Sequence, residues 1–215
     1  LVKVCSYITD PVTTTDELIP SGETSSYRSN PERLSEFALS RRDPQYVGRS
    51  KVMRQIERDR EAGKALPEEV MKVYEALTKA GVANDPANTD IGSTIFANMP
   101  GDGSAREQAA SCQRVMGASA NFAKQYATKR YRSNCINWGM TPFLVENPEV
   151  FELGDYIFVP GIREAVLENK ASFSAYAVKP DGTVTEFPVS TGALTEAERQ
   201  IIADGCLINY YRNNQ

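Results

Sequence analysis

The amino-acid sequence predicts one α/β domain in which helices flank a mixed β-sheet. Two observations carry this prediction. From residue 91 onwards, short apolar segments of strand character alternate with segments of helical periodicity. Further along, Lys179-Pro180-Asp181-Gly182 separates two strand candidates, and an Asp-Gly pair supplies the positive φ that a tight hairpin needs. Strands that alternate with helices, with one hairpin among them, give a mixed sheet.

The first 90 residues are predicted to hold a short strand, a short helix and a helical insertion. After the opening strand, a loop rich in Thr, Ser, Pro and Gly continues to about residue 30. Asn30-Pro31-Glu32 then begins a short helix, because Asn caps helices and Pro is favoured in the first turn. The region from about 48 to 90 is expected to be a helical insertion. Its clearest helix is 67–80, with apolar residues at Val70, Val73, Tyr74 and Leu77.

The rest of the chain divides into short elements. The strand candidates are 93–97, 121–126, 142–145, 155–159, 173–178 and 183–189. The helix candidates are 104–116, 128–137, 162–167 and 195–211. Thr195, with Glu198 three residues later, forms the signature of a capping box for the last of these helices.

The composition excludes several classes of protein. A formal net charge of −4 argues against a nucleic-acid partner, which would require a basic face. No apolar run approaches the roughly 20 residues that span a bilayer, so no membrane association is expected. The chain contains no histidine, which excludes Ser-His-Asp and Cys-His catalytic groups within it.

The cysteines predict neither a metal site nor a disulfide framework. Cys5, Cys112, Cys135 and Cys206 are widely spaced and include no Cys-x-x-Cys pair. We expect reduced and mostly buried thiols, a cytoplasmic protein, and no metal bound by this chain. The sequence starts Leu1-Val2-Lys3 without a methionine, so we expect a piece of a longer polypeptide.

The most informative stretch is Gly101-Asp102-Gly103-Ser104-Ala105-Arg106-Glu107. Its two glycines allow the backbone to turn tightly and to approach a ligand closely. Ser104 falls at the start of a predicted helix, where free N–H groups and the helix dipole favour an anion. Arg106 adds a guanidinium fork that suits a carboxylate. In such an electropositive corner the ionised form of Ser104 would be stabilised, so this residue could remove a proton from carbon without a histidine.

Three interpretations of this stretch stay open on spacing alone. The leading one is a capping box, because Ser104 and Glu107 are spaced as in the Ser-x-x-Glu signature. A site for a carboxylate or phosphate is the second interpretation, and a catalytic serine is the third. A Walker phosphate loop is excluded, because no lysine follows the glycines.

Residues 101–110, Gly-Asp-Gly-Ser-Ala-Arg-Glu-Gln-Ala-Ala, resemble the Gly-x-Gly-Ser-Ser-Arg-Glu-His-Ala-Ala signature of the aconitase swivel domain. Residues 14–22 resemble the Thr-Thr-Asp-His-Ile-Ser-x-Ala-Gly segment that opens this domain. Their Asp-x-x-Ile-Pro form is also similar to the small subunit of isopropylmalate isomerase. Residues 125–127, with Asn134 and Gly139, resemble a third stretch of the family. The resemblance implies the swivelling β/β/α fold of the aconitase C-terminal type over residues 1–215.

The resemblance also implies roles for individual residues. Ser104 occupies the position of the family's catalytic base, which takes a proton from the substrate carbon beside a carboxylate. Arg106 fills the position of an arginine that binds a substrate carboxylate. Ala105 replaces a second serine that helps to hold the substrate in aconitase, so neither citrate nor isocitrate is assigned as the substrate.

Three further residues are candidates for substrate binding by the same resemblance. A match continued without a gap from Thr14 places Arg28 at the family's second substrate arginine, and Arg49 is the alternative that needs a gap. Asp16 matches the family's aspartate near the start of the domain. Each residue also has a structural interpretation, with both arginines as solvated side chains and Asp16 as the cap of a turn.

The family carries a [4Fe–4S] cluster that this chain is not expected to bind. The resemblance implies an iron that acts as a Lewis acid in hydration and dehydration. In the family, three cysteines that include a Cys-x-x-Cys pair hold the cluster, and this chain has no such pair. The expected partners are therefore the cluster-bearing domains of the same polypeptide and a small hydroxy-acid substrate. The isolated domain is expected to be inactive.

Three functions follow from these observations, in decreasing order of support. The leading hypothesis is the swivel domain of an aconitase-like hydro-lyase that acts on a hydroxy di- or tricarboxylic acid. The second is a separate small subunit of an isopropylmalate- or homoaconitate-type isomerase. The third is a non-enzymatic binding relic.

Overall fold

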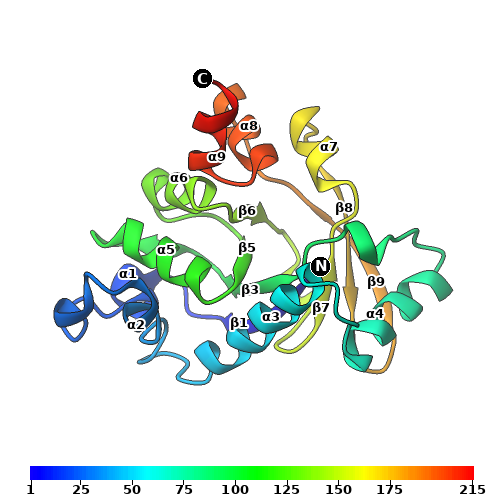
Figure 1. Ribbon diagram of the computed structural model, residues 1–215, viewed down its shortest axis with the longest axis horizontal. Coiled ribbons are helices and arrows are strands. Elements are labelled where there is room, and N and C mark those ends of the chain that lie inside the picture. Colours follow the sequence, from blue (N-terminus) through cyan, green and yellow to red (C-terminus); the bar gives the residue numbers. More distant parts are fainter.

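Seven strands form one mixed sheet in the computed structural model, which describes residues 1–215 (Figure 1). The strand order is β6-β5-β3-β1-β7-β8-β9. The parallel strands are β1 (Val2–Ile8), β3 (Gly92–Ala97), β5 (Ala118–Ala123) and β6 (Thr141–Leu144). The antiparallel strands are β7 (Tyr156–Phe158), β8 (Phe173–Val178) and β9 (Val184–Val189). The predicted α/β class and the mixed sheet are confirmed.

The sheet curls until its two edges meet. A pair of backbone hydrogen bonds, 2.7 and 3.1 Å long, joins Leu144 in β6 to Ser190 just after β9. All seven strands contribute apolar side chains to a buried cluster on the inner face, where Phe122 stacks on Phe143 with 4.8 Å between ring centroids. Burial of this apolar area is favourable by about 25 cal/mol per Å², which stabilises the curled form.

Side chains of the central strands are buried on both faces. In β3, Phe96 points into the inner cluster, whereas Ile95 and Ala97 belong to the outer one. This alternation follows from the two-residue period of a strand. Because both faces are covered, β3 is buried along its whole length, and this includes its polar residues Ser93 and Thr94.

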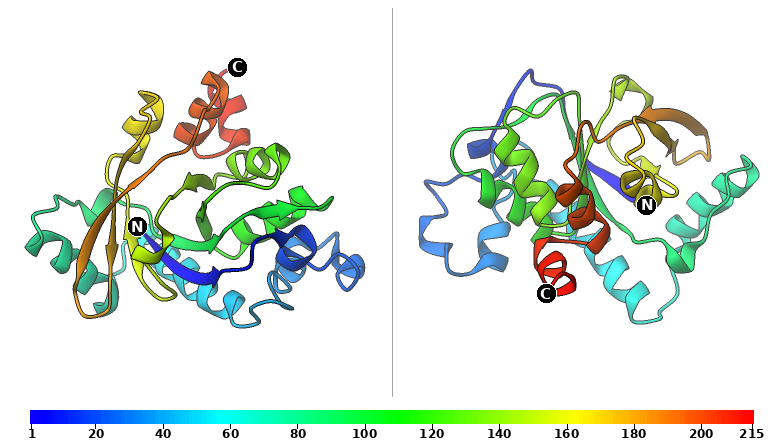
Figure 2. Two further views of the ribbon diagram at one scale, coloured as in Figure 1. Left: turned by 180° about the vertical axis from the view of Figure 1, so that it is seen from behind. Right: turned by 90° about the horizontal axis from the view of Figure 1, so that it is seen from above.

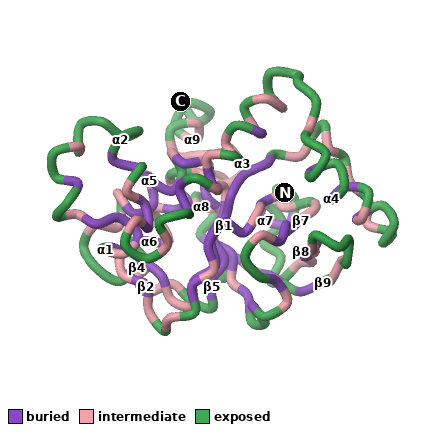
Figure 3. The backbone as a smooth tube through the Cα atoms, turned by 90° about the horizontal axis from the view of Figure 1, so that it is seen from below, coloured by how far each residue is buried: buried purple, intermediate pink, exposed green.

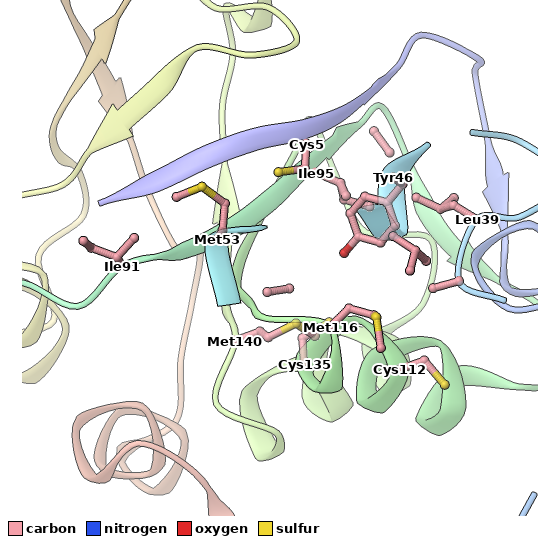
Figure 4. Packing of buried hydrophobic residues seen from close by; sticks show 14 of the residues in the cluster. Cys5, Leu39, Tyr46, Met53, Ile91, Ile95, Cys112, Met116, Cys135 and Met140 are labelled. Carbon is pink, nitrogen blue, oxygen red and sulfur yellow. The ribbon is translucent and has the colours of Figure 1, made fainter. Parts of the chain in front are cut away.

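Helices cover the outer face of the sheet. The helices that pack on strands of this sheet are α3 (Tyr46–Glu61), α4 (Glu68–Lys79), α5 (Arg106–Val115) and α6 (Lys129–Asn137). Two short helices, α1 (Thr15–Leu18) and α2 (Pro31–Ser35), pack against α5. Their apolar sides form the larger core cluster, in which Tyr46 and Met53 of α3 lie across from Met116 (Figure 4). None of the helices combines the length and the apolar character that crossing a bilayer requires.

The region from 48 to 90 contains most of α3 and the whole of α4, and both helices belong to the main core. Met53 and Ile56 of α3, with Val70 and Leu77 of α4, are buried in the outer cluster. Short 3-10 turns at Ser25–Tyr27, Pro86–Asn88 and Pro148–Val150 complete the connections. Removal of residues 48–90 would therefore expose the outer face of β1 and β3.

The C-terminal part differs from the single helix predicted over 195–211. It consists of α8 (Glu196–Asp204) and α9 (Leu207–Asn213), which lie with α6 and α7 (Ile162–Leu167) at one end of the molecule (Figure 2). The capping box of Thr195 and Glu198 is confirmed. The chain breaks at Gly205, whose φ is +97°, where its carbonyl approaches Gly139 closely.

A second, two-stranded sheet lies at the carboxyl ends of β1 and β3 (Figure 3). It pairs β2 (Thr13–Thr14), which follows β1, in parallel with β4 (Pro100–Asp102), which follows β3. Both connections therefore leave the main sheet at the same edge. In open α/β sheets, ligands bind at the carboxyl ends of the parallel strands.

Replacement of Gly139 by alanine should cost more stability than the same change at Gly182. Both residues have positive φ values, +86° and +89°, so both variants bear the left-handed penalty of roughly 1–2 kcal/mol. Only at Gly139 would the new Cβ meet a backbone atom, 2.1 Å from the carbonyl oxygen of Gly205, whereas the space around Gly182 is open. Urea unfolding measures the difference, and equal midpoints for the two variants would contradict the close contact.

Candidate functional site

Two segments far apart in the sequence lie side by side at this edge of the sheet. In the β2–β4 pair, Thr13 pairs with Pro100 and Thr14 with Asp102. Gly103 lies against the next residue of the first segment, since a Cβ at Gly103 would come 2.2 Å from Thr15 Oγ1. These are the two segments that resemble the aconitase family at 14–22 and 101–110. The topology thus places both in one site.

The two glycines of this loop adopt backbone conformations that other residues rarely take. Gly101 has a φ of +101° and Gly103 a φ of +135°. A Cβ at Gly101 would come 2.4 Å from the ring of Tyr131. Both the dihedral angles and the surrounding atoms therefore require glycine at these positions, in agreement with the tight turn predicted for them.

Ser104 follows the loop and is exposed to solvent. It is not the cap of α5, because the N-cap residue is Ala105 and no side chain caps the first turn. Glu107 does not bond back to the loop, and its Oε1 instead accepts a hydrogen bond of 3.2 Å from Trp138 Nε1. The capping-box interpretation is therefore wrong. The first turn of α5 keeps its free N–H groups and the positive end of the helix dipole beside the serine.

The side chains of Ala105 and Arg106 lie in different surroundings. Ala105 is partly buried against the outer core cluster, so its methyl group serves packing. Arg106 is partly exposed, but its Nε is buried and has no hydrogen-bond partner within the chain. A buried donor without an acceptor costs about 1–3 kcal/mol. The Nη groups of Arg106 are not among the buried atoms and make no hydrogen bond or ion pair within the chain, so they can bind a carboxylate from outside the chain.

Asp16 is engaged within the protein. Its Oδ2 accepts a hydrogen bond of 2.8 Å from Arg41 Nη1, and its Oδ1 accepts one of 3.3 Å from the backbone N–H of Ser21. Arg41 also pairs with Glu23 at 3.1 Å. The cap of α1 is Thr14, which forms a capping box with Glu17. These contacts give Asp16 a structural role in the loop that leads from α1 towards Arg28.

The two alternative arginines differ in their contacts. Arg28 is exposed at the end of the 3-10 turn Ser25–Tyr27 and takes part in no ion pair. Arg49 in α3 donates to the Asp43 carboxylate at 3.0 Å and to the carbonyl oxygen of Cys5 at 3.2 Å. The structure brings the Asp16 segment to the Ser104 loop, and it joins neither arginine to Ser104 by a contact. Of the two arginines, Arg28 has the free guanidinium.

Sequence reasoning missed the residues that support the glycine loop from beneath. Thr128 caps α6 and its hydroxyl donates to the carbonyl oxygen of Gly101 at 3.2 Å, while the ring of Tyr131 fills the space below. The N–H of Ala127 donates to the carbonyl oxygen of Pro100 at 3.0 Å. The sequence indicates Thr128 as the first residue of the predicted helix 128–137. No local pattern indicates that this helix touches the loop.

The cysteines of this chain do not fit a [4Fe–4S] cluster. Cys5, Cys112 and Cys135 lie apart on β1, α5 and α6, and they are buried in the outer core (Figure 4). Burial raises the pKa of both Cys5 and Cys135 to about 12, which disfavours the thiolate that binds metal. Nowhere do three or more His, Cys, Asp or Glu side chains gather in a way that could hold a metal ion.

A thiol titration should find one reactive cysteine in the folded protein. Cys206 is partly exposed, whereas Cys5, Cys112 and Cys135 are buried and burial raises the pKa of each of these three thiols. At about pH 8 their thiolate fractions are therefore below that of an ordinary cysteine. A disulfide reagent should modify one thiol quickly and the other three only after denaturation. The C206S variant should lose the fast phase, and fast modification of two or more thiols would contradict the buried placement.

Comparison with known proteins supports the resemblance noted from the motifs. The chain is 29% identical to the methanogen homoaconitase small subunit of Methanocaldococcus jannaschii over 133 residues, which are 61% of this chain and 69% of that protein. The crystal structure of 3-isopropylmalate dehydratase from the same organism matches 97% of this chain and 92% of that one, with a TM-score of 0.55 and 18% identity. No protein-family model matches the sequence. The resemblance to small subunits of the aconitase family and the swivel-type fold are confirmed.

The comparison changes the order of the functional hypotheses. The relative found by sequence is named as a small subunit. This favours the second hypothesis over the first, in which one polypeptide would join a swivel domain to cluster-bearing domains. The expectation of partner domains in the same polypeptide is not supported.

Proposed function

We propose that this chain is the small subunit of an isopropylmalate- or homoaconitate-type isomerase. Such an enzyme is a hydro-lyase that removes water from a hydroxy di- or tricarboxylic acid and adds it back. The observation that carries the proposal is the β2–β4 pair, which sets the Asp16 segment beside the Ser104 loop. The similarity to a homoaconitase small subunit supports the substrate class.

The chemistry proposed for this chain is the transfer of a proton at carbon. The ionised Ser104 oxygen would take the proton from the carbon beside a substrate carboxylate, and the electron pair left behind would spread into that carboxylate. This pair then forms the double bond as the hydroxyl group leaves the neighbouring carbon as hydroxide. The guanidinium of Arg106 would bind this group and stabilise the charge that develops on it. The uncapped first turn of α5 adds the positive end of its dipole at the same place.

A second arginine suits a substrate with more than one carboxylate. Arg28 is exposed and unpaired on the loop that follows α1, and the 3-10 turn before it packs on α2, which in turn packs on α5. Tyr27 anchors this loop by stacking on Phe37 with 5.5 Å between ring centroids. Arg28 would hold the carboxylate remote from the reacting carbon.

The partner in this proposal is a large subunit in a cytoplasmic complex. The family resemblance implies a [4Fe–4S] cluster, and the buried, scattered thiols of this chain leave its binding to that partner. The small subunit would contribute the base and the carboxylate ligands. Alone it would bind substrate weakly and would not turn it over.

Substitution of Ser104 by alanine should reduce turnover by about 100-fold or more, which is the usual effect of losing a general base. The measurement is hydration of the unsaturated acid by the variant assembled with the large subunit. Ser172→Ala is the matched control, because Ser172 is also exposed and lies in the loop before β8. Wild-type turnover in the Ser104 variant would refute its assignment as base.

Conservative changes at the two candidate arginines should separate their roles. Arg28→Lys replaces a two-pronged fork by a point charge, so KM for the hydroxy acid should rise about tenfold with unchanged thermal stability. Arg49→Lys should lower the melting temperature and leave KM unchanged, because Arg49 binds Asp43 and the Cys5 carbonyl. The opposite pattern would make Arg49 the substrate ligand.

A further inference from the structure

A buried polar network lies beneath the glycine loop. Gln113 of α5, Asn121 of β5, and Tyr131 and Cys135 of α6 are all 0% exposed. The Tyr131 hydroxyl donates to Gln113 Oε1 at 2.7 Å, and Asn121 Nδ2 donates to the Tyr131 oxygen at 3.1 Å. Asn121 Nδ2 also lies 3.5 Å from Cys135 Sγ. The network ties two helices and a strand of the main sheet to one phenol.

The same tyrosine supports the loop that carries the site. Its ring contacts the backbone of Gly101, where an added Cβ would come 2.4 Å from ring atoms. Its backbone N–H donates to Thr128 Oγ1 at 3.1 Å, and Thr128 in turn donates to the carbonyl oxygen of Gly101 at 3.2 Å. The first turn of α6 therefore holds the loop both by packing and by a hydrogen bond.

Packing alone does not account for the polar atoms of this network. A phenylalanine would fill the space beneath Gly101 with the same ring. A buried phenol and two buried amides are costly unless each finds a partner, and a satisfied network fixes one orientation of its members. Burial also raises the pKa of Tyr131 well above its ordinary value, so the phenol keeps its proton and remains a donor. The ring of Tyr131 therefore fills the space beneath Gly101, and its hydroxyl fixes the orientation of that ring.

We propose that Tyr131 is a positioning residue that acts on Ser104 and Arg106 through the glycine loop. The hydrogen bonds of the network fix the orientation of the Tyr131 ring. This ring contacts the backbone of Gly101 and fixes its position, and the chain continues from there through Gly103 to Ser104 and α5. Because Gln113 belongs to α5, the same network also fixes this helix, which begins with Arg106, against α6. The role assigned to Tyr131 rests on the proposed function of the loop.

Turnover by the assembled enzyme tests this role. In Tyr131→Phe the ring remains and the hydrogen bonds to Gln113 and Asn121 are lost, so kcat should fall about tenfold or more with a smaller change in KM. Tyr126→Phe is the matched control. The Tyr126 hydroxyl donates to the backbone carbonyl oxygens of Phe143 at 3.0 Å and of Asn121 at 3.3 Å, so its loss leaves the side-chain hydrogen bonds of the network in place. Its ring centroid lies 6.3 Å from that of Tyr131. Equal kcat values for both variants and the wild type would overturn the proposal.

A second variant tests whether a lower kcat arises from loss of the network and not from a change at Tyr131 alone. Gln113→Met removes the acceptor of the phenol from α5 and leaves the tyrosine in place. It should lower kcat in the same way as Tyr131→Phe. Loss of activity in the tyrosine variant alone would contradict the network as the cause.

Hydrogen exchange supplies a readout that does not depend on activity. Mass spectrometry of the chain should show faster amide exchange over residues 100–106 in Tyr131→Phe than in the wild type, with no change in Tyr126→Phe. If the assembled wild-type protein shows no hydro-lyase activity, the proposed function fails and exchange alone decides whether Tyr131 positions the loop. Equal exchange over residues 100–106 in all three proteins would overturn the positioning role.

Discussion

The close backbone approach at Gly101 and Gly103 is the constraint on which the site depends. The ring of Tyr131 lies beneath the first glycine and the hydroxyl of Thr15 lies against the second. No larger side chain fits at either place, and both residues have φ values that favour glycine. This approach allows β2 and β4 to pair, and the pairing places the Asp16 segment beside Ser104 at the carboxyl edge of the parallel strands.

The rest of the fold holds that edge in place and leaves one side of it open. The curled sheet, closed by the bridge between Leu144 and Ser190, gives the parallel strands a rigid base. Helices on the outer face bury the core, whereas Ser104 remains exposed and Arg106 keeps a buried donor without an acceptor. An exposed hydroxyl and unpaired guanidinium groups, without residues that fit a metal cluster, are consistent with the proposal that this chain supplies one part of a two-subunit active site.

Local signals predicted most elements, and contacts between distant elements account for the errors. The helix predicted over 128–137, the hairpin at residues 179–182 and the amphipathic pattern of α4 each depend on neighbouring residues and were confirmed. The break at Gly205 depends on Gly139, a residue in the turn that follows α6. The capping box at Ser104 failed because Glu107 binds Trp138 at the end of α6. Likewise, the contacts with Asp43 and with the Cys5 carbonyl oxygen, which the sequence does not reveal, distinguish Arg49 from Arg28.

A crystal structure of the chain assembled with a large subunit and a bound hydroxy dicarboxylate would test the central claim most directly. The account predicts that the Ser104 hydroxyl faces the carbon that loses the proton, with one carboxylate held by the guanidinium of Arg106 above the glycine loop. A ligand bound at another edge of the sheet would contradict it. So would a complex in which the large subunit covers Ser104 and leaves no ligand beside it.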